Sequence, residues 1–247
     1  MNRYLLISFL LMPFTASSQF TTTEKNMYSA EVKDSFEIYS TLPANYQPAG
    51  RYKVVYYFDA NLKSGKELRA MLSGQANGQL SDYIFIGIGH IGNYHVLRRR
   101  DFILPVIKNH DTLPAGKNYG GAAQFYSFLT KELIPQVNRQ YHTYADSNSV
   151  IGHSLGGLFV FYCLFRNASF FSNYFALSPA LWVDNYAIYQ FSQLKEGPPG
   201  PRTLYLACGG AETMNYILAG CNKMSAFLGE KNYPPLRWKF EVWPGET

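Results

Sequence analysis

The sequence has 247 residues, of which 47% are hydrophobic and 16% charged, so a disordered chain is excluded and one large domain with an apolar core is expected. The formal net charge of +5 is small and spread along the chain, which does not indicate a nucleic-acid partner. Three cysteines at wide spacing form no disulfide framework, and the absence of CxxC and HxxxH patterns implies no metal or other cofactor.

Residues 1–18 have the pattern of a secretory signal peptide. Arg3 precedes an apolar run over residues 4–12, and the small residues 16–18 follow it. The run is too short to anchor the chain stably across a membrane. We therefore expect cleavage after Ser18, a mature N-terminus at Gln19, and a periplasmic or extracellular protein. An uncleaved membrane tether is the alternative.

Eight segments have the pattern of β-strands. The first two flank a short polar turn and indicate an antiparallel hairpin. Continuous apolar runs such as 54–58 are typical of strands buried on both faces of a parallel sheet. The last segment alternates apolar and polar residues, which predicts a half-exposed edge strand. In chain order the predicted strands are 28–32, 36–42, 54–58, 83–88, 148–151, 173–177, 203–208 and 236–243.

Helical segments separate most of these strands. They are predicted at 63–72, 121–141, 155–166, 186–194 and 213–229. A hairpin followed by repeated strand–helix units predicts an α/β fold, in which helices cover both faces of one mostly parallel, eight-stranded sheet. The whole of residues 19–247 is expected to form this single domain.

The segment 150–158, VIGHSLGGL, combines an apolar strand, a sharp turn and an apolar helix. Residues 152–156 match G-x-S-x-G, the nucleophile elbow, in which a serine occupies a strained turn. Side chains at Gly152 or Gly156 are expected to clash with the neighbouring strand and helix. The pentapeptide alone is a weak signal, but its position between strand and helix favours Ser154 as a nucleophile over an incidental turn serine.

A serine nucleophile needs donors for the oxyanion that forms when it attacks a carbonyl group. The N–H of Leu155 lies in the first turn of the predicted helix, where the helix dipole favours negative charge. The second donor normally comes from the loop after an earlier strand, which here is 59–62, and we favour the N–H of Asn61. The alternative for this loop is an ordinary turn in which Asp59 or Asn61 caps a helix.

The carboxylate that orients the base is expected after a later strand. Glu212 follows strand 203–208 and is the favoured acid. Asp184 is the alternative acid, and either carboxylate can instead cap a helix. Trp182 lies beyond its strand and is interpreted as part of the substrate pocket.

The sequence resembles the enterochelin-esterase-like branch of the α/β-hydrolases, which also includes feruloyl esterases and the mycolyltransferase antigens. The resemblance covers nearly the whole mature chain and is carried by the segments VVYYFDAN, RRRDFILP, GGAAQFYSFLTKELIP, IGHSLGGLF, ALSPALWVDN and VWPGET. It implies the α/β-hydrolase fold, Ser154 as nucleophile, and an oxyanion hole formed by the N–H groups of Asn61 and Leu155. The family usually has Asp-Gly where this sequence has Asp59-Ala60.

These features favour an exported serine esterase that forms an acyl-enzyme on Ser154. The alternatives are an acyltransferase of the same fold and a non-catalytic binding domain, since fold alone does not decide function. The substrate is expected to be a small-molecule or polysaccharide-linked ester. A siderophore, a feruloyl or acetyl polysaccharide, and a short-chain ester are all consistent with the sequence.

The catalytic histidine is the unexpected part of the sequence. In this fold the base follows the last strand, yet all the histidines precede Ser154 and none fits: His90, His95, His110, His142 and His153. Strand alternation is expected to point the His153 side chain away from Ser154. His90 is the fallback base, because it follows a strand at the reactive edge.

The family's last-strand loop typically reads Pro-Gly-Glu-Thr-His, and this sequence reads Pro244-Gly245-Glu246-Thr247. The resemblance therefore implies a chain cut one residue before its catalytic histidine, without its closing helix. Such a chain is expected to be nearly inactive as given.

Overall fold

The computed structural model describes residues 21–74, 80–105, 119–166, 170–192, 201–213, 216–234 and 236–246. The predicted signal peptide and His110 lie outside the described residues. Within the described part of the chain, no helix is both long enough and apolar enough to cross a membrane.

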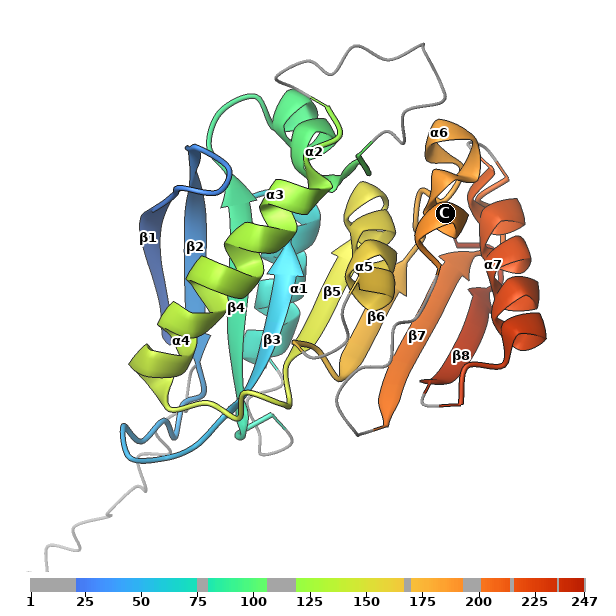
Figure 1. Cartoon of the computed structure of the whole chain (residues 1–247). Helices are drawn as coiled ribbons and strands as arrows, with labels where there is room; N and C mark the ends of the chain where they lie inside the picture. Colours follow the sequence, from blue (N-terminus) through green and yellow to red (C-terminus); the bar gives the residue numbers. More distant parts are fainter. Residues whose placement is uncertain are drawn as a thin grey trace, which may run out of the picture.

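One eight-stranded sheet runs through the described residues in the order β1-β2-β4-β3-β5-β6-β7-β8 (Figure 1). The β1–β2 and β2–β4 pairs are antiparallel, and the other neighbouring strands pair in parallel. The strands are β1 Thr21–Ser29, β2 Asp34–Leu42, β3 Lys53–Phe58, β4 Tyr83–His90, β5 Ser149–His153, β6 Asn173–Leu177, β7 Arg202–Gly209 and β8 Leu236–Trp243. The predicted mostly parallel α/β sheet is confirmed.

All the predicted strands are present, but the first lies earlier in the chain than 28–32. β1 ends at Ser29, and the turn that follows includes Lys33 in the left-handed region, with φ of 60°. Residues 21–26 are polar and exposed along the edge of the sheet, so they lack the apolar alternation that marks a half-buried strand.

The helices are α1 Lys63–Gly74, α2 Tyr94–Phe102, α3 Ala122–Ser127, α4 Ile134–Tyr141, α5 Leu155–Arg166, α6 Val183–Tyr186 and α7 Ile217–Lys231. A π-helical segment, Phe128–Leu133, joins α3 to α4, so the helix predicted over 121–141 is not regular throughout. The helix predicted over 186–194 instead consists of α6 and a 3-10 segment, Ala187–Phe191, within the described residues.

The sequence pattern does not predict α2. This helix carries three consecutive arginines, and its apolar residues do not recur at helical spacing. Only Asp101 and Phe102 at its end are buried. The helix packs beside α3 and α5, which brings Arg98 and Arg99 to the edge of the sheet where the strands end.

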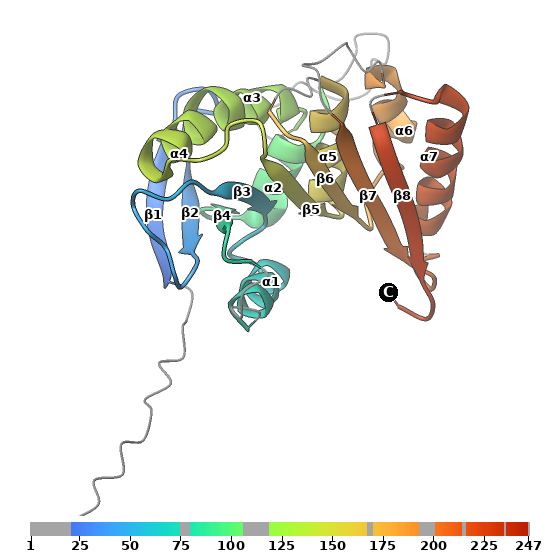
Figure 2. The ribbon, with the colours of Figure 1, turned by 90° about the horizontal axis from the view of Figure 1, so that it is seen from below.

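Alternate side chains of the central strands face two apolar layers. Val54 and Phe58 of β3 belong to a large cluster that also contains residues of α2, α3, α4, α5 and α7. Tyr57, between them, belongs to a smaller cluster on the other face, against which Leu68 of α1 packs. Figure 2 shows α1 on the opposite side of the sheet from α3 and α4. The expected covering of both faces is confirmed.

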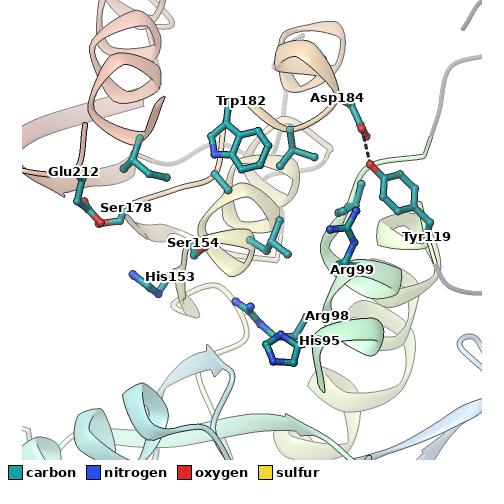
Figure 3. A pocket seen from close by; sticks show the side chains of 15 residues that line it. His95, Arg98, Arg99, Tyr119, His153, Ser154, Ser178, Trp182, Asp184 and Glu212 are labelled. Carbon is teal, nitrogen blue, oxygen red and sulfur yellow. Dashed lines mark hydrogen bonds between the residues drawn. The ribbon is translucent and has the colours of Figure 1, made fainter. Parts of the chain in front are cut away.

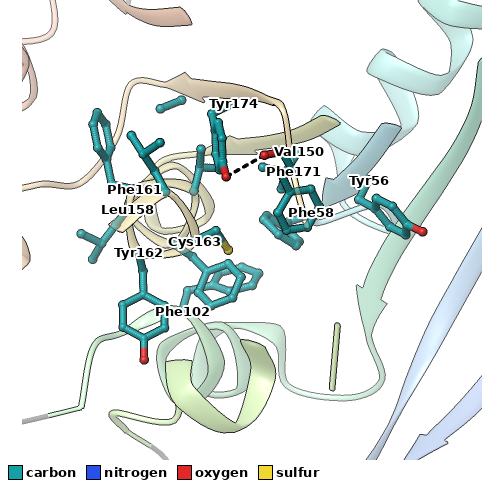
Figure 4. Packing of buried hydrophobic residues seen from close by; sticks show 14 of the residues in the cluster. Tyr56, Phe58, Phe102, Val150, Leu158, Phe161, Tyr162, Cys163, Phe171 and Tyr174 are labelled. Carbon is teal, nitrogen blue, oxygen red and sulfur yellow. Dashed lines mark hydrogen bonds between the residues drawn. The ribbon is translucent and has the colours of Figure 1, made fainter. Parts of the chain in front are cut away.

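The most deeply buried helix is α5, in which residues 156–165 are all buried. Figure 4 shows its side chains Phe161, Tyr162 and Cys163 packed among aromatic residues of the neighbouring elements. A helix that is apolar all round is typical of a protein core, and each large side chain that it buries contributes about 1.5–3 kcal/mol. The turn that begins α5, at Ser154, is therefore attached to a rigid part of the fold.

The carboxyl ends of the parallel strands meet at one edge of the sheet, where ligands bind in open α/β sheets. The predicted site residues follow these ends. Asp59 comes after β3, Ser154 after β5, Trp182 after β6 and Glu212 after β7.

Candidate active site

Ser154 occupies the sharp turn between β5 and α5. Its φ of 57° lies in the left-handed region, which is uncommon for a residue with a side chain. Its N–H donates to the carbonyl of Leu177, and its carbonyl accepts from the N–H groups of Leu158 and Ala180, each at 3.0 Å. The hydrogen bonds to Leu177 and Ala180, in β6 and the loop after it, hold the strained turn in place. This is the backbone geometry that a nucleophile elbow requires.

Of the two glycines expected to be sterically required in the elbow, the structure confirms Gly152 and not Gly156. A Cβ on Gly152 would lie 2.2 Å from the carbonyl oxygen of Gly156, which no side chain can tolerate. A Cβ on Gly156 itself would make only ordinary contacts, at 3.6 Å, so the expected clash there is wrong. The second tight position is Gly157, where a Cβ would lie 3.0 Å from Pro179.

Gly152→Ala is expected to destabilise the fold by about 2 kcal/mol or more, because the added methyl group must displace backbone of the elbow. Gly229→Ala in α7 is the matched control, since nothing lies within 4 Å of a Cβ there. The control is expected to gain about 0.5–1 kcal/mol from helix propensity. Urea unfolding of both variants measures the difference, and a Gly152→Ala variant as stable as the parent chain contradicts this account.

Ser154 lies in the wall of a cavity of about 730 Å³ (Figure 3). One wall is cationic and comes from α2, and apolar lining comes from Val183 of α6 and Ile217 of α7. The lining residues are His95, Arg98, Arg99, Ile103, Tyr119, His153, Ser154, Leu155, Ser178, Ala180, Trp182, Val183, Asp184, Glu212 and Ile217. The structure thus brings most of the predicted site residues together, with Trp182 in the wall. Asn61 is not among the lining residues.

The two predicted oxyanion donors lie on adjoining segments. Leu155 is the first residue of α5, where N–H groups have no partner within the helix. The N–H of Asn61 meets no acceptor among the described residues, and its side-chain Nδ2 donates to the carbonyl of His90 at 2.8 Å. A Cβ on Gly156 would lie 3.6 Å from Asp59 Oδ2, so the Asp59 loop touches the elbow.

The Asp59-Ala60 sequence, where the family usually has Asp-Gly, fits the loop without strain at the second residue. The left-handed residue is Asp59, with φ of 59°, and Ala60 does not have positive φ. The methyl group of Ala60 is buried in space that Gly87 leaves open, because a Cβ on Gly87 would approach Ala60 Cβ to 2.6 Å.

Glu212 points its carboxylate at the loop after β6. Oε2 accepts a hydrogen bond from Ser178 Oγ at 2.6 Å and another from the N–H of Gly209 at 2.7 Å (Figure 3). Oε1 meets no donor among the described residues. The carboxylate is therefore held firmly by one oxygen, and the other oxygen remains available to a further donor.

Asp184 has a different partner and lies on the other side of the cavity. It accepts a hydrogen bond from Tyr119 Oη at 2.5 Å, and burial together with this carboxylate raises the pKa of Tyr119 (Figure 3). The guanidinium of Arg99 lies 5.6 Å from the centre of the Tyr119 ring. The hydrogen bond between Tyr119 and Asp184 ties α6 to the chain before α3, which gives Asp184 a structural role in the cavity wall.

His153 lines the same cavity as Ser154, and it also lines a smaller pocket with Leu68 of α1, on the other face of the sheet from α5. Part of the ring is open to the cavity, and protein on its other sides desolvates it. This desolvation lowers the pKa of His153; Glu212 and Asp59 act against it, whereas Arg98 lowers the pKa further. No hydrogen bond joins His153 to Ser154 among the described contacts.

The prediction of His90 as the fallback base is wrong. Its ring is buried, and Nε2 lies 3.0 Å from Asp101 Oδ2, which is also buried. Arg100 donates to both oxygens of Asp101 and to Asp34, which closes a charged network behind α2. β4 extends beyond the predicted strand to His90, and this places the ring among core aromatic residues and outside the lining of the cavity.

No group of three or more metal-ligating side chains lies together within the described residues. Cys163, Cys208 and Cys221 are free thiols, and all are buried.

Comparisons with known proteins agree in family and fold. The family model described as "Putative esterase" matches residues 29–204. The ferri-bacillibactin esterase BesA of Bacillus subtilis (strain 168) is 29% identical over 204 residues, which cover 77% of this chain and 71% of the relative.

Solved structures give the same picture. The BES protein from Bacillus cereus has a TM-score of 0.77 at 24% identity, over 100% of this chain and 92% of that one. An IroE-like serine hydrolase from Shewanella oneidensis has a TM-score of 0.75 at 25% identity, over 92% of this chain and 75% of that one.

Proposed function

The chain belongs to the "Putative esterase" family and is a carboxylic ester hydrolase, and from this premise we propose that it cleaves esters through a covalent intermediate on Ser154. The observation that carries the proposal is the left-handed turn at Ser154, which presents the serine to a cavity that Leu155 and Glu212 also line. A strained serine between strand and helix, at the carboxyl edge of a parallel sheet, is the arrangement that acyl transfer uses.

In the proposed reaction, Ser154 Oγ attacks the ester carbonyl carbon and its proton passes to a base. The carbonyl oxygen becomes an oxyanion that the N–H groups of Leu155 and Asn61 stabilise. The C–O bond of the ester then breaks, and the base returns the proton to the departing alcohol. Water, deprotonated by the same base, then attacks the acyl carbon; the bond from this carbon to Ser154 Oγ breaks, and the base returns the proton to Oγ as the acid leaves.

We propose Glu212 as the acid that orients this base, and the loop after β8 as the place from which the base reaches it. The N–H of Gly210 donates to the carbonyl of Trp243 at 2.8 Å, and the N–H of Ala211 donates to the carbonyl of Glu246 at 3.0 Å. The loop after β8 therefore lies directly against the loop that carries Glu212.

A variant in which a histidine follows Thr247 tests this placement. Because a missing triad member costs several powers of ten in turnover, the added histidine is expected to raise esterase turnover by about 10²-fold or more. An added alanine is the control. Equal turnover for the two extended chains contradicts the placement of the base.

The proposed substrate is a siderophore ester, a small iron-chelating molecule. The relative BesA is described as a ferri-bacillibactin esterase. The cationic wall with Arg98 and Arg99 suits the negative charge of such chelates, and Trp182, with 38% of its surface exposed, offers an aromatic face. The cationic wall favours an anionic substrate over a neutral short-chain ester.

The substrate test compares a siderophore trilactone, with and without Fe³⁺, with methyl ferulate, acetylated xylan and p-nitrophenyl acetate. Hydrolysis is followed by chromatography, on the chain with and without the added histidine. The trilactone is expected to have the highest kcat/KM, by about 10-fold or more, since the charged wall contributes only where the substrate carries charge. A higher kcat/KM for the feruloyl or acetyl ester contradicts the siderophore proposal and leaves ester hydrolysis intact.

We also propose that the protein is exported, on the pattern of residues 1–18. Mass spectrometry of the protein from its native host is expected to find Gln19 at the N-terminus. An intact Met1 in the cytoplasmic fraction contradicts export.

A further inference from the structure

We propose that Arg98 is a positioning residue that holds the Asp59 loop, and through it the oxyanion donor at Asn61, against the nucleophile elbow. The proposal rests on the proposed function, because it concerns the oxyanion hole of the same reaction. It concerns a residue on α2, a helix that the sequence does not predict and that contributes neither nucleophile nor acid.

The contact between Arg98 and Asp59 is bidentate. Arg98 Nε donates to Oδ1 at 2.6 Å and Nη2 donates to Oδ2 at 2.8 Å. The side chains are 15% and 6% exposed, so water competes little for either group. Two parallel charge-assisted hydrogen bonds of this kind fix both distance and orientation, which a lysine at the same position cannot do.

Asp59 is also the strained residue of its loop, with φ of 59°. A left-handed conformation at a residue with a side chain costs about 1–2 kcal/mol and persists only where surrounding contacts enforce it. The Arg98 pair supplies such a contact at the side chain. At the backbone, the carbonyl of Asp59 accepts from the N–H of Leu62 at 2.9 Å.

Two other donors of the loop have backbone carbonyl groups as acceptors. The N–H of Ala60 donates to the carbonyl of Ile88 at 3.1 Å, and Asn61 Nδ2 donates to the carbonyl of His90 at 2.8 Å. The N–H of Asn61, by contrast, meets no acceptor among the described residues. A shift at Asp59 therefore moves the unpaired donor directly, because only two peptide bonds separate them.

The anchor for Arg98 is rigid as well. Two residues further along α2, Arg100 binds Asp101, which in turn binds the buried His90. α2 is thus tied to β4 on one side, and Arg98 extends from it to Asp59 on the other. Arg98 also lines the cavity, so the group that sets the oxyanion loop is in reach of the substrate.

Arg99 offers a matched control on the same helix. It lines the same cavity and carries the same charge, but its guanidinium lies over the Tyr119 ring. Loss of charge from the cavity therefore affects both variants, whereas loss of loop position affects only Arg98→Gln.

The test uses phenylboronic acid as a mimic of the tetrahedral intermediate, on the full chain. Ser154 Oγ forms a bond to boron and releases its proton to water, and the boron becomes tetrahedral with one oxygen in the oxyanion hole. ¹¹B NMR reports the tetrahedral adduct and its dissociation constant. Arg98→Gln is expected to raise the dissociation constant of the adduct by about 10-fold or more, because a displaced donor no longer stabilises the oxygen in the oxyanion hole. Arg99→Gln is expected to remain within about twofold to threefold, since it leaves the loop in place.

Esterase kinetics supply the second readout. In the chain with the added histidine, both variants are expected to raise KM through the lost charge, but only Arg98→Gln is expected also to lower kcat, because the donor acts on the transition state. Asp59→Asn is expected to match Arg98→Gln, and the double variant is expected to lose no more than either single variant.

The outcomes separate the two proposals. An Arg98→Gln variant that binds the boronate within about twofold of the parent chain overturns the positioning role, since an undisturbed oxyanion hole binds unchanged. If Arg98→Gln does not fold, Arg98→Lys takes its place, and unchanged boronate binding there overturns the role in the same way. A parent chain whose adduct persists in Ser154→Ala, or that forms none, overturns the proposed function itself.

Discussion

In the chain with the added histidine, replacing Ser154 by alanine is expected to lower ester turnover by about 10³-fold or more, because the covalent step loses its nucleophile. The fold is expected to persist. Alanine keeps the Cβ of serine, so the strain of the left-handed turn is the same in both chains, and the backbone hydrogen bonds at residue 154 do not involve the side chain. The expected change in unfolding free energy is below about 1 kcal/mol.

The comparison is made with p-nitrophenyl acetate in steady state, together with thermal unfolding of each variant. Ser147→Ala is the matched control, because Ser147 lies in the turn before β5, at the other end of the strand from the elbow, and outside the cavity. If Ser154→Ala retains the turnover of the chain with the added histidine, the assignment of Ser154 as the nucleophile is wrong. The melting curve of the variant shows whether a fall in turnover comes from unfolding or from loss of the nucleophile.

Glu212→Gln is expected to lower turnover by about 10³–10⁴-fold, in the chain with the added histidine, because an amide neither stabilises the imidazolium nor fixes its tautomer. The side-chain oxygen of glutamine still accepts from Ser178 Oγ and from the N–H of Gly209. The loss is therefore expected in kcat and not in stability.

Asp184→Asn is the control for Glu212→Gln, and its expected loss is below about 10-fold. Asp184 is bound to Tyr119 on the other side of the cavity, where it shapes the wall. The opposite ranking of the two variants moves the acid role to Asp184. Small and nearly equal effects favour a serine–histidine dyad without an acid.

The strands could be predicted because burial leaves a local pattern. The β3 segment is a continuous apolar run, because its side chains face two apolar layers. The predicted bounds of β6 agree with those observed. Where burial is absent the pattern fails. The exposed residues 21–26 of β1 were missed, and α2 was missed because its arginines interrupt any apolar spacing.

Site residues could be predicted where a local motif or the position after a strand marks them. They could not be predicted where they depend on contacts between residues far apart in the sequence. Ser154 was found from five consecutive residues, and Glu212 from its position after a strand. The Arg98–Asp59 pair spans 39 residues and the Tyr119–Asp184 pair spans 65, so no local pattern contains either.

His90 shows the converse. Its place after a predicted strand suggested a base. β4 continues to His90 itself, however, and the buried ring is bound by Asp101 of α2.

The most direct test of the central claim, covalent catalysis at Ser154, is peptide mapping by mass spectrometry after exposure of the chain with the added histidine to a p-nitrophenyl phosphonate. The serine displaces p-nitrophenol, and the phosphonyl group remains attached to Oγ. The expected result is one phosphonyl group per chain, on the peptide that contains Ser154, and none in Ser154→Ala. An unmodified Ser154 in a folded chain with the added histidine, or an adduct on another residue, contradicts the claim and favours the non-catalytic binding domain.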